Sequence, residues 1–272
     1  MRFIGADSFE LSAADALTNP AALIALAGKR CYKSFEPGLN PNVTRIRKDY
    51  TTYLDNVLAS RHGSVCEHSV YTFAIENISR VFTAEMNRHR AGWAISEGSM
   101  RFIRYSDSIP YWEPGSVAGD QVLPTTSADS IVSTMLQDRA APPPPSLSLL
   151  SKKQLTRRVL QEAFTHQEAA YSAMERIWAD ELSPESKFAE KKQITSMMRR
   201  IVGMGVATGG VWTGNIRALR HVIAMRASEQ AEEEMLHVFS RVAKFMVEKE
   251  PMLFGDFEET SEGYWQPRYI KV

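Results

Sequence analysis

Apolar side chains recur every three or four positions over residues 20–61, which is the spacing of an amphipathic helix. Pro37, Gly38 and Pro41 interrupt this pattern and predict a break. We therefore expect two helices here.

The pattern changes to strict alternation over Ser69 to Ile78, which predicts a strand. A helix is expected to follow directly, from about Ser79 to Arg90. Gly92 and Gly98 then bracket an expected irregular turn that leads into residues 100–105.

Helical spacing resumes after residue 153. The sequence predicts a long helix over 154–182, another beginning at Ser183-Pro184, and two final helices over about 215–227 and 229–249. Between them, the Gly-rich stretch 203–214 contains the β-prone residues Val211, Trp212 and Thr213.

Residues 107–151 include the proline run 142–145 and many small polar residues, so we expect little regular structure there. A linker between two domains is one interpretation. We favour an insertion into a single domain covering residues 1–272, because the basic motifs on either side resemble halves of one site.

The composition is that of an ordinary soluble globular protein, with 272 residues and 44% hydrophobic residues. Two cysteines cannot form a zinc cluster or a disulfide framework, and no segment resembles a signal peptide or a membrane span. A cytoplasmic protein that does not enter membranes is the expectation. The 32 basic and 32 acidic residues argue against a surface built wholly for nucleic acid.

Positive charge is nevertheless concentrated locally. The segment Lys191 to Ser228 contains seven Lys and Arg residues and no Asp or Glu. A second cluster joins the triplet Arg88-His89-Arg90 to Arg101 and Arg104. Arginine matches phosphate and carboxylate geometry, so these clusters are candidates for anion binding, although a solvated basic face is the simpler interpretation.

Arg226 projects from the apolar stripe of its own predicted helix, whereas Arg217 and His221 lie on roughly the opposite side. A core-facing guanidinium needs either a carboxylate or a bound anion as its partner. Glu85 is likewise placed among apolar neighbours, where pairing with an arginine and a ligand role are both open.

Three blocks together resemble the flavin-dependent thymidylate synthase family. Arg88-His89-Arg90 is followed by residues 96–101 (SEGSMR), and this pair is similar to the family's signature of an RHR triplet, a Ser and an Arg. Residues 62–68 (HGSVCEH) and 213–221 (TGNIRALRH), with Arg226 downstream, match two further family segments in the same order.

The resemblance implies an α/β (α+β) subunit with a mostly antiparallel sheet flanked by long helices. It also implies a homotetramer whose sites are shared between protomers. The implied reaction is FAD-dependent C5 methylation of dUMP to dTMP, with methylenetetrahydrofolate as carbon donor and NADPH as reductant. The implied FAD contacts are His62, Ser64, Glu67, Arg88, His89, Arg90, Asn215, Arg217 and His221.

By the same resemblance, the nucleotide would be held by Glu85, Arg88, Glu97, Ser99, Arg101, Arg199 and Arg226. Ser99 and Arg226 are the catalytic candidates, because Arg226 beside a uracil carbonyl could stabilise negative charge in the ring. No cysteine nucleophile is assigned, since Cys66 lies beside Glu67 and lacks an activating neighbour.

Glu85 departs from the Gln that many family members carry at this position. A carboxylate can accept from two neighbouring hydroxyls, which ribose offers and deoxyribose does not. UMP is therefore an alternative substrate, as in family members of nucleoside-antibiotic pathways. A nucleic-acid-binding module using residues 191–228 and a flavoprotein without folate chemistry are further alternatives, and a metal site is not expected.

Overall fold

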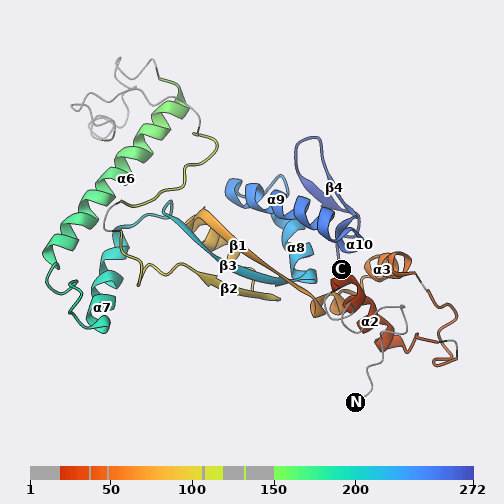
Figure 1. Cartoon of the computed structure of the whole chain (residues 1–272). Coiled ribbons are helices and arrows are strands. Elements are labelled where there is room, and N and C mark those ends of the chain that lie inside the picture. The colour runs from red at the N-terminus through yellow and green to blue at the C-terminus, as the bar shows by residue number, and fades with distance from the viewer. Residues whose placement is uncertain (1–18, 37, 48, 106–107, 119–131, 133–149) are drawn as a thin grey trace. The chain divides into compact units, whose positions relative to one another are not determined.

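The computed structural model describes residues 19–36, 38–47, 49–105, 108–118, 132 and 150–272 (Figure 1). These residues form two compact units that alternate along the chain. The first unit contains the described residues up to 75, together with 85–96 and 211–272. The second unit contains 76–84 and the described part of 97–210.

The two expected N-terminal helices are confirmed as α2, Pro20–Tyr32, and α3, Tyr50–Ala59. Each begins at a polar cap. The Asn19 side chain accepts a hydrogen bond from Ala22 N at 3.1 Å, and Asp49 accepts one from Thr52 N at 2.7 Å. A short 3-10 helix, η2, Gly63–His68, follows α3 and packs against α2.

Three strands form the main sheet in the order β1-β3-β2. They are β1, Val70–Ser79, β2, Trp93–Glu97, and β3, Ala207–Asn215. The strand expected from alternation is confirmed as β1. The irregular turn expected between Gly92 and Gly98 was wrong, because these residues form β2. Gly214 on β3 lies so close to the Trp93 ring that a Cβ there would be 2.8 Å from it.

The helix after β1 is shorter than expected. It is α4, Arg80–Met86, and it ends before the triplet Arg88-His89-Arg90. His89 N donates to Met86 O at 3.0 Å, and Trp93 N donates to Arg90 O at 3.3 Å. The chain leaves α4 at Met86 and enters β2 at Trp93, so the triplet lies in the connection between them and not on a helix.

The second unit is built on α6, Lys152–Ile177, and α7, Phe188–Met198, which is followed by the 3-10 turn η3, Arg199–Ile201. Its hydrophobic core draws on both helices and on the segments before β3; the buried members are Tyr105, Ile109, Tyr171, Leu182, Ile194, Met198 and Val206. Residues 108–118 lie along α6, where the Tyr111 and Phe164 rings stack with centroids 3.7 Å apart.

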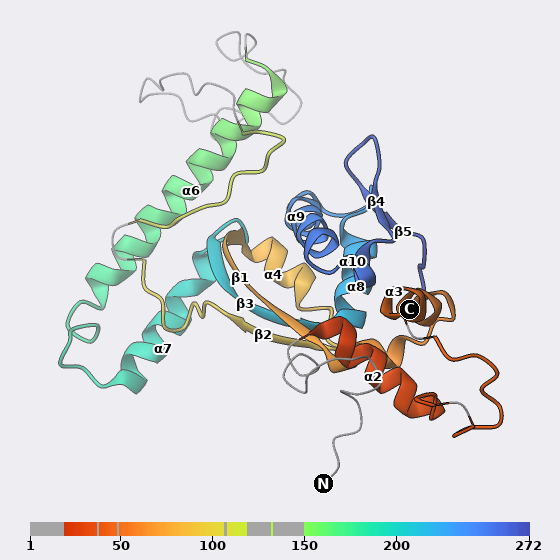
Figure 2. The same cartoon turned by 45° about the vertical axis from the view of Figure 1, so that its right-hand side comes forward.

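The C-terminal part of the first unit contains α8, Ile216–Arg226, α9, Glu233–Lys249, and α10, Pro251–Phe254. An antiparallel hairpin follows, in which β4, Phe257–Glu259, pairs with β5, Trp265–Pro267. Helix α9 packs against α8 and α10, and β5 packs against α8 (Figure 2). Their buried side chains include Leu219, Val222, Ile223, Met235, Phe239, Met246 and Phe254.

The expected class, a mixed helix-and-sheet fold with antiparallel pairing, is confirmed. Most of the expected insertion over residues 107–151, including the proline run, lies outside the described residues. The assignment of residues 1–272 to one domain stays a prediction. None of the described helices is long and apolar enough to span a bilayer.

Candidate functional site

A cavity of about 490 Å³ lies in the first unit, at the start of α8. Four of the expected cofactor-binding residues line it: Glu67, Asn215, Arg217 and His221. The cavity wall also includes Arg61, residues 91–92 and the C-terminal residues 267 and 269–272. Segments far apart in the sequence thus meet at one concave surface.

Asn215 connects the end of β3 to the beginning of α8. Its side-chain oxygen accepts from Ala218 N at 2.8 Å, and its backbone N donates to Gly92 O at 3.0 Å. Gly92 has a φ of +77°, and a Cβ there would lie 2.6 Å from the Asn215 amide nitrogen. Only glycine meets both requirements. The positive end of the α8 dipole is therefore directed at the cavity.

Arg217 and Glu67 form an ion pair at 2.6 Å across the cavity wall, with each side chain about half exposed (47% and 48%). Arg217 Nε also donates to Val272 O at 3.1 Å. Exposed charges of this kind add little to stability, about 0–1 kcal/mol. They remain available to a ligand because the solvent already reaches them.

The other expected cofactor residues lie outside the cavity lining. The His62 ring stacks on the Tyr32 ring with centroids 5.6 Å apart, and Ser64 is exposed on η2. Arg88 and Arg90 are exposed in the connection after α4. Tyr32 had no signal in the sequence beyond its place in a helical run.

Arg226 is held by two other expected site residues. Its Nη2 atom lies 3.0 Å from Glu85 Oε2, and its Nε donates to His89 Nε2 at 2.9 Å. The partner required by a core-facing guanidinium is thus a carboxylate, Glu85. The Arg226 and Glu85 side chains are 17% and 31% exposed, so a ligand can still reach the pair.

His89 accepts the Arg226 hydrogen bond on Nε2, so that nitrogen carries no proton. Burial lowers the pKa of His89, and the positive charge of Arg226 lowers it further. The neighbouring His221 ring meets His89 edge to face, with centroids 6.4 Å apart. A neutral His89 therefore connects the Arg226 pair to a residue of the cavity wall.

The remaining expected nucleotide residues lie in the second unit. Glu97 pairs with Arg80 at 3.1 Å, and Ser99 begins the turn after β2. Arg101 Nε donates to Ser196 on α7 at 3.2 Å, and exposed Arg199 follows at the end of the same helix. The expected nucleotide residues thus form two groups, one in each unit.

Both cysteines are free thiols. Cys66 is buried on η2, and this burial, more than the adjacent Glu67, raises the pKa of its thiol to about 11. It lacks the depressed pKa of a catalytic nucleophile. Among the described residues, no three His, Cys, Asp or Glu side chains form a group that could hold a metal ion.

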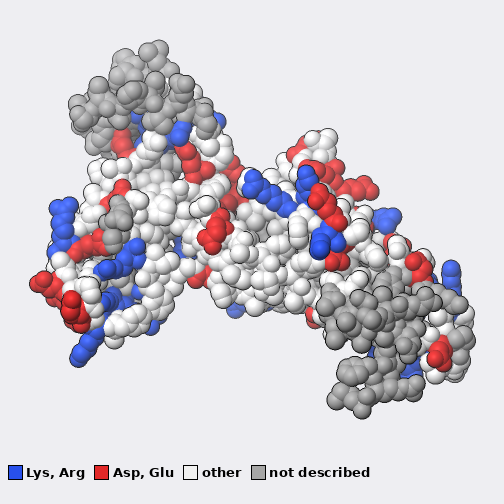
Figure 3. Space-filling model, in the orientation of Figure 1, with Lys and Arg blue, Asp and Glu red and all other residues white. Residues whose placement is uncertain are grey.

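Three of the five arginines in the basic segment Lys191 to Ser228 are ion-paired within the first unit. Arg217 pairs with Glu67, Arg220 with Asp256, and Arg226 with Glu85. Basic and acidic side chains also stand beside one another on the described face in Figure 3. This arrangement disfavours the nucleic-acid-binding alternative.

Residues 14–252 match the family model described as thymidylate synthase complementing protein. The flavin-dependent thymidylate synthase of Mycobacteroides abscessus is 31% identical over 87% of this chain and 79% of its own length. The enzyme of the same name from Mycobacterium tuberculosis is 29% identical over 88% of this chain and 80% of its own length.

Two solved structures have a similar fold. A flavin-dependent thymidylate synthase from Helicobacter pylori, complexed with FAD and dUMP, matches with a TM-score of 0.50 at 16% identity, covering 88% of this chain and 95% of that one. A UMP/dUMP methylase from Streptomyces cacaoi, bound with 5-Br dUMP, matches with a TM-score of 0.56 at 16% identity, covering 86% and 88%.

Proposed function

The chain belongs to the flavin-dependent thymidylate synthase family of methyltransferases, and from this premise we propose that it methylates C5 of a uridine 5′-monophosphate in an FAD-dependent reaction. The preferred substrate is dUMP, which becomes dTMP. Methylenetetrahydrofolate is the carbon donor and NADPH is the reductant. The cytoplasm is the proposed location.

The cavity at the start of α8 carries this proposal. A diphosphate needs convergent N–H and cationic donors, and the cavity supplies Arg217 and the N-terminal end of α8. The lining also includes Ala91 and Gly92 and the exposed carboxylate of Glu67, which are small or polar groups beside the cationic ones. The residues present therefore fit FAD.

Bound FAD would supply hydride-transfer chemistry between NADPH and the one-carbon unit of the folate. The protein's own task is to orient the ligands and to stabilise charge. Asn215, Arg217 and His221 hold the cofactor, together with Glu67. His62, Ser64, Arg88, His89 and Arg90 complete this group in our proposal.

Arg226 is the proposed stabiliser of the reacting ring. A guanidinium beside a uracil carbonyl oxygen would stabilise anionic character in the ring, the form in which C5 is a nucleophile toward the one-carbon unit. The contacts with Glu85 and His89 fix the position of Arg226 before the nucleotide arrives. Such preorganisation avoids a reorientation cost during the reaction.

The group in the second unit is also proposed to bind the nucleotide. Arg101 and Arg199 are both exposed near the end of α7 and suit a monophosphate. Ser99 and Glu97 add a hydroxyl and a carboxylate. Arg88, in the first unit, is a further proposed nucleotide-binding residue.

UMP is the second candidate substrate. Glu85, the residue expected to accept hydrogen bonds from ribose hydroxyls, is ion-paired with Arg226. If Arg226 lies at the uracil, a carboxylate beside it is within the nucleotide site, where it can accept from ribose hydroxyls. The expected product would then be 5-methyl-UMP.

A homotetramer with shared sites is also proposed. One face of the sheet within the first unit is open to solvent and carries apolar side chains, with Val70 58% and Val211 43% exposed. Contact with other copies of the chain would cover this face.

The test is reconstitution with FAD, followed by anaerobic assay with methylenetetrahydrofolate, NADPH and either dUMP or UMP. We expect a flavin absorbance spectrum and turnover that requires all three additions. Arg217→Ala should weaken FAD binding by tenfold or more, whereas Arg241→Ala on α9 should not change it. Wild-type protein that binds no flavin would contradict the proposal.

A further inference from the structure

The C-terminal segment Pro267 to Val272 forms a wall of the same cavity, although no sequence motif marks it. It runs from β5 to η2 and α8. Gly63 on η2 is in such close contact with Val272 that a Cβ at position 63 would overlap the Val272 carbonyl carbon. The segment is therefore seated against the residues expected to bind the cofactor.

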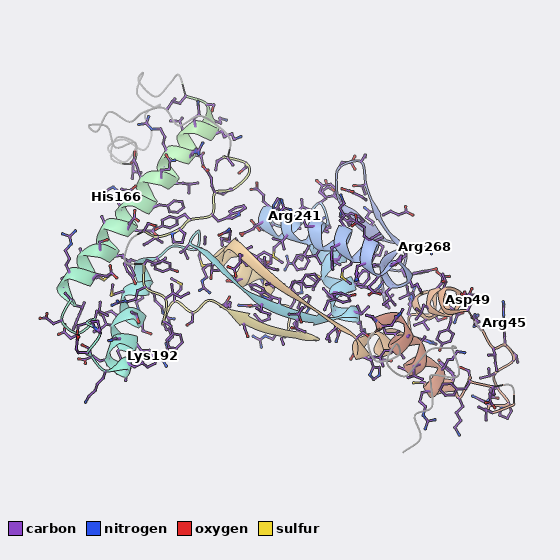
Figure 4. The ribbon with its side chains drawn as sticks, viewed as in Figure 1. Arg45, Asp49, His166, Lys192, Arg241 and Arg268 are labelled. Atoms are coloured by element: carbon purple, nitrogen blue, oxygen red, sulfur yellow. The ribbon has the colours of Figure 1, made fainter. Side chains whose placement is uncertain are left out.

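Hydrogen bonds fix this segment on two sides. Asp256 accepts from Tyr269 N at 3.1 Å and is itself held by Arg220 of α8 through bonds of 2.7 and 2.8 Å. On the other side, Asp55 of α3 accepts from Tyr269 Oη at 2.8 Å and from Arg268 at 3.2 Å. Figure 4 labels Arg268 on this segment.

Four cationic side chains line the cavity, and two of them already have a carboxylate partner. Arg217 pairs with Glu67, and Arg220 is buried against Asp256 with both side chains 3% exposed. Within the described part of the chain, Arg61 and Lys271 have no ion-pair partner. These two exposed side chains are the uncompensated positive charge of the cavity.

Arg61 occupies a backbone position that favours glycine. It follows α3 with a φ of +59°, its N donates to Leu58 O, and His62 N donates to Val57 O, which is the hydrogen-bond pattern of a glycine-type helix end. A side chain there costs conformational free energy. An arginine at this unfavourable position that also lines the cavity points to a use for its guanidinium.

We infer that Arg61 and Lys271 bind the diphosphate of the cofactor and that the C-terminal segment is part of the cofactor site. This inference rests on the proposed function, because it assigns the cavity to FAD. Neither residue belongs to the motifs that identify the family in this chain.

The two residues allow variants that separate binding from folding. Arg61→Gly removes the guanidinium and gives the backbone the residue it prefers, so the free protein should unfold at an equal or higher temperature. Lys271→Ala removes an exposed charge, and Lys271→Arg restores it. Lys249→Ala, at the end of α9, is the matched control because Lys249 does not line the cavity.

FAD affinity of the full chain is measured by titrating apoprotein and following flavin fluorescence. We expect Arg61→Gly and Lys271→Ala each to weaken binding about tenfold or more, as expected for a charge-assisted contact. Lys271→Arg should recover most of the loss. Added salt should weaken wild-type binding more than binding by the double variant.

Two negative outcomes are distinguishable. If the wild type binds FAD and both single variants bind it within twofold of the wild type, this inference is overturned while the proposed function stands. If the wild type binds no FAD, the proposed function fails and the inference fails with it.

Discussion

The ion pair between Arg226 and Glu85 allows a quantitative test of how the reacting site is built. Arg226→Ala removes the contact with Glu85 at 3.0 Å and the hydrogen bond to His89 at 2.9 Å. It leaves a carboxylate that is only 31% exposed without its partner. Hydrogen bonds to charged groups contribute about 1.5–3 kcal/mol each, and partial exposure reduces that value.

We therefore expect Arg226→Ala to lower the free energy of unfolding by about 2 kcal/mol, which corresponds to a melting temperature lower by about 4–8 °C. Glu85→Gln should lower it less, since a neutral amide is left. In the double variant the loss should be smaller than the sum of the two by about 1 kcal/mol. Urea unfolding of the four proteins measures this coupling.

The same variants should behave differently in catalysis. Arg226→Ala should reduce kcat/KM by about a hundredfold or more, since a donor to developing charge is lost. Arg226→Lys should be intermediate, because an ammonium cannot reach Glu85 and His89 in the same fork geometry. Arg241→Ala, an exposed arginine labelled in Figure 4, is the control and should change neither property. Additivity of the two stability losses within about 0.3 kcal/mol would contradict the coupling between Arg226 and Glu85, and full activity of Arg226→Ala would contradict its role in the reaction.

Three further predictions concern other groups. Asp256→Asn leaves the buried Arg220 guanidinium without its carboxylate partner and should cost about 3–5 kcal/mol in urea unfolding, whereas Arg220→Met with Asp256→Leu should cost less; equal losses would contradict this expectation. His89 has a lowered pKa, so below about pH 6.5 the unfolded chain binds a proton that the folded chain does not. Stability should therefore fall as the pH drops through that range, and His89→Gln should flatten the dependence in thermal melts. Iodoacetamide at pH 8 should modify exposed Cys31 and spare Cys66, and Cys66→Ser should keep turnover; labelling of Cys66 in the native protein would contradict its burial.

Helices and strands whose apolar residues recur at a regular spacing were predictable from the sequence. The alternation after Ser69 gave β1 in nearly correct register, and the spacing of apolar residues located α6, α8 and α9. β2 was missed because its five residues are mixed in size and polarity and lie between two glycines. Its identity depends on pairing with β3, which is more than 100 residues away.

The site residues also divide into those that the sequence predicts and those that only the fold brings together. The need of Arg226 for a partner followed from helical geometry, and the structure supplies Glu85. Lys271 and Tyr269 could not be found, because their place at the cavity depends on how the chain returns from β5. Arg61 was missed for another reason: its φ of +59° becomes visible only once the end of α3 is known.

The most direct measurement is the mass of the nucleotide after anaerobic incubation of the FAD-reconstituted protein with methylenetetrahydrofolate, NADPH and an equal mixture of dUMP and UMP. We expect a C5-methylated product, formed only when FAD is present and lost in Arg226→Ala. Unchanged nucleotides, despite a bound flavin that NADPH reduces, would contradict the proposed methylation of a uridine monophosphate.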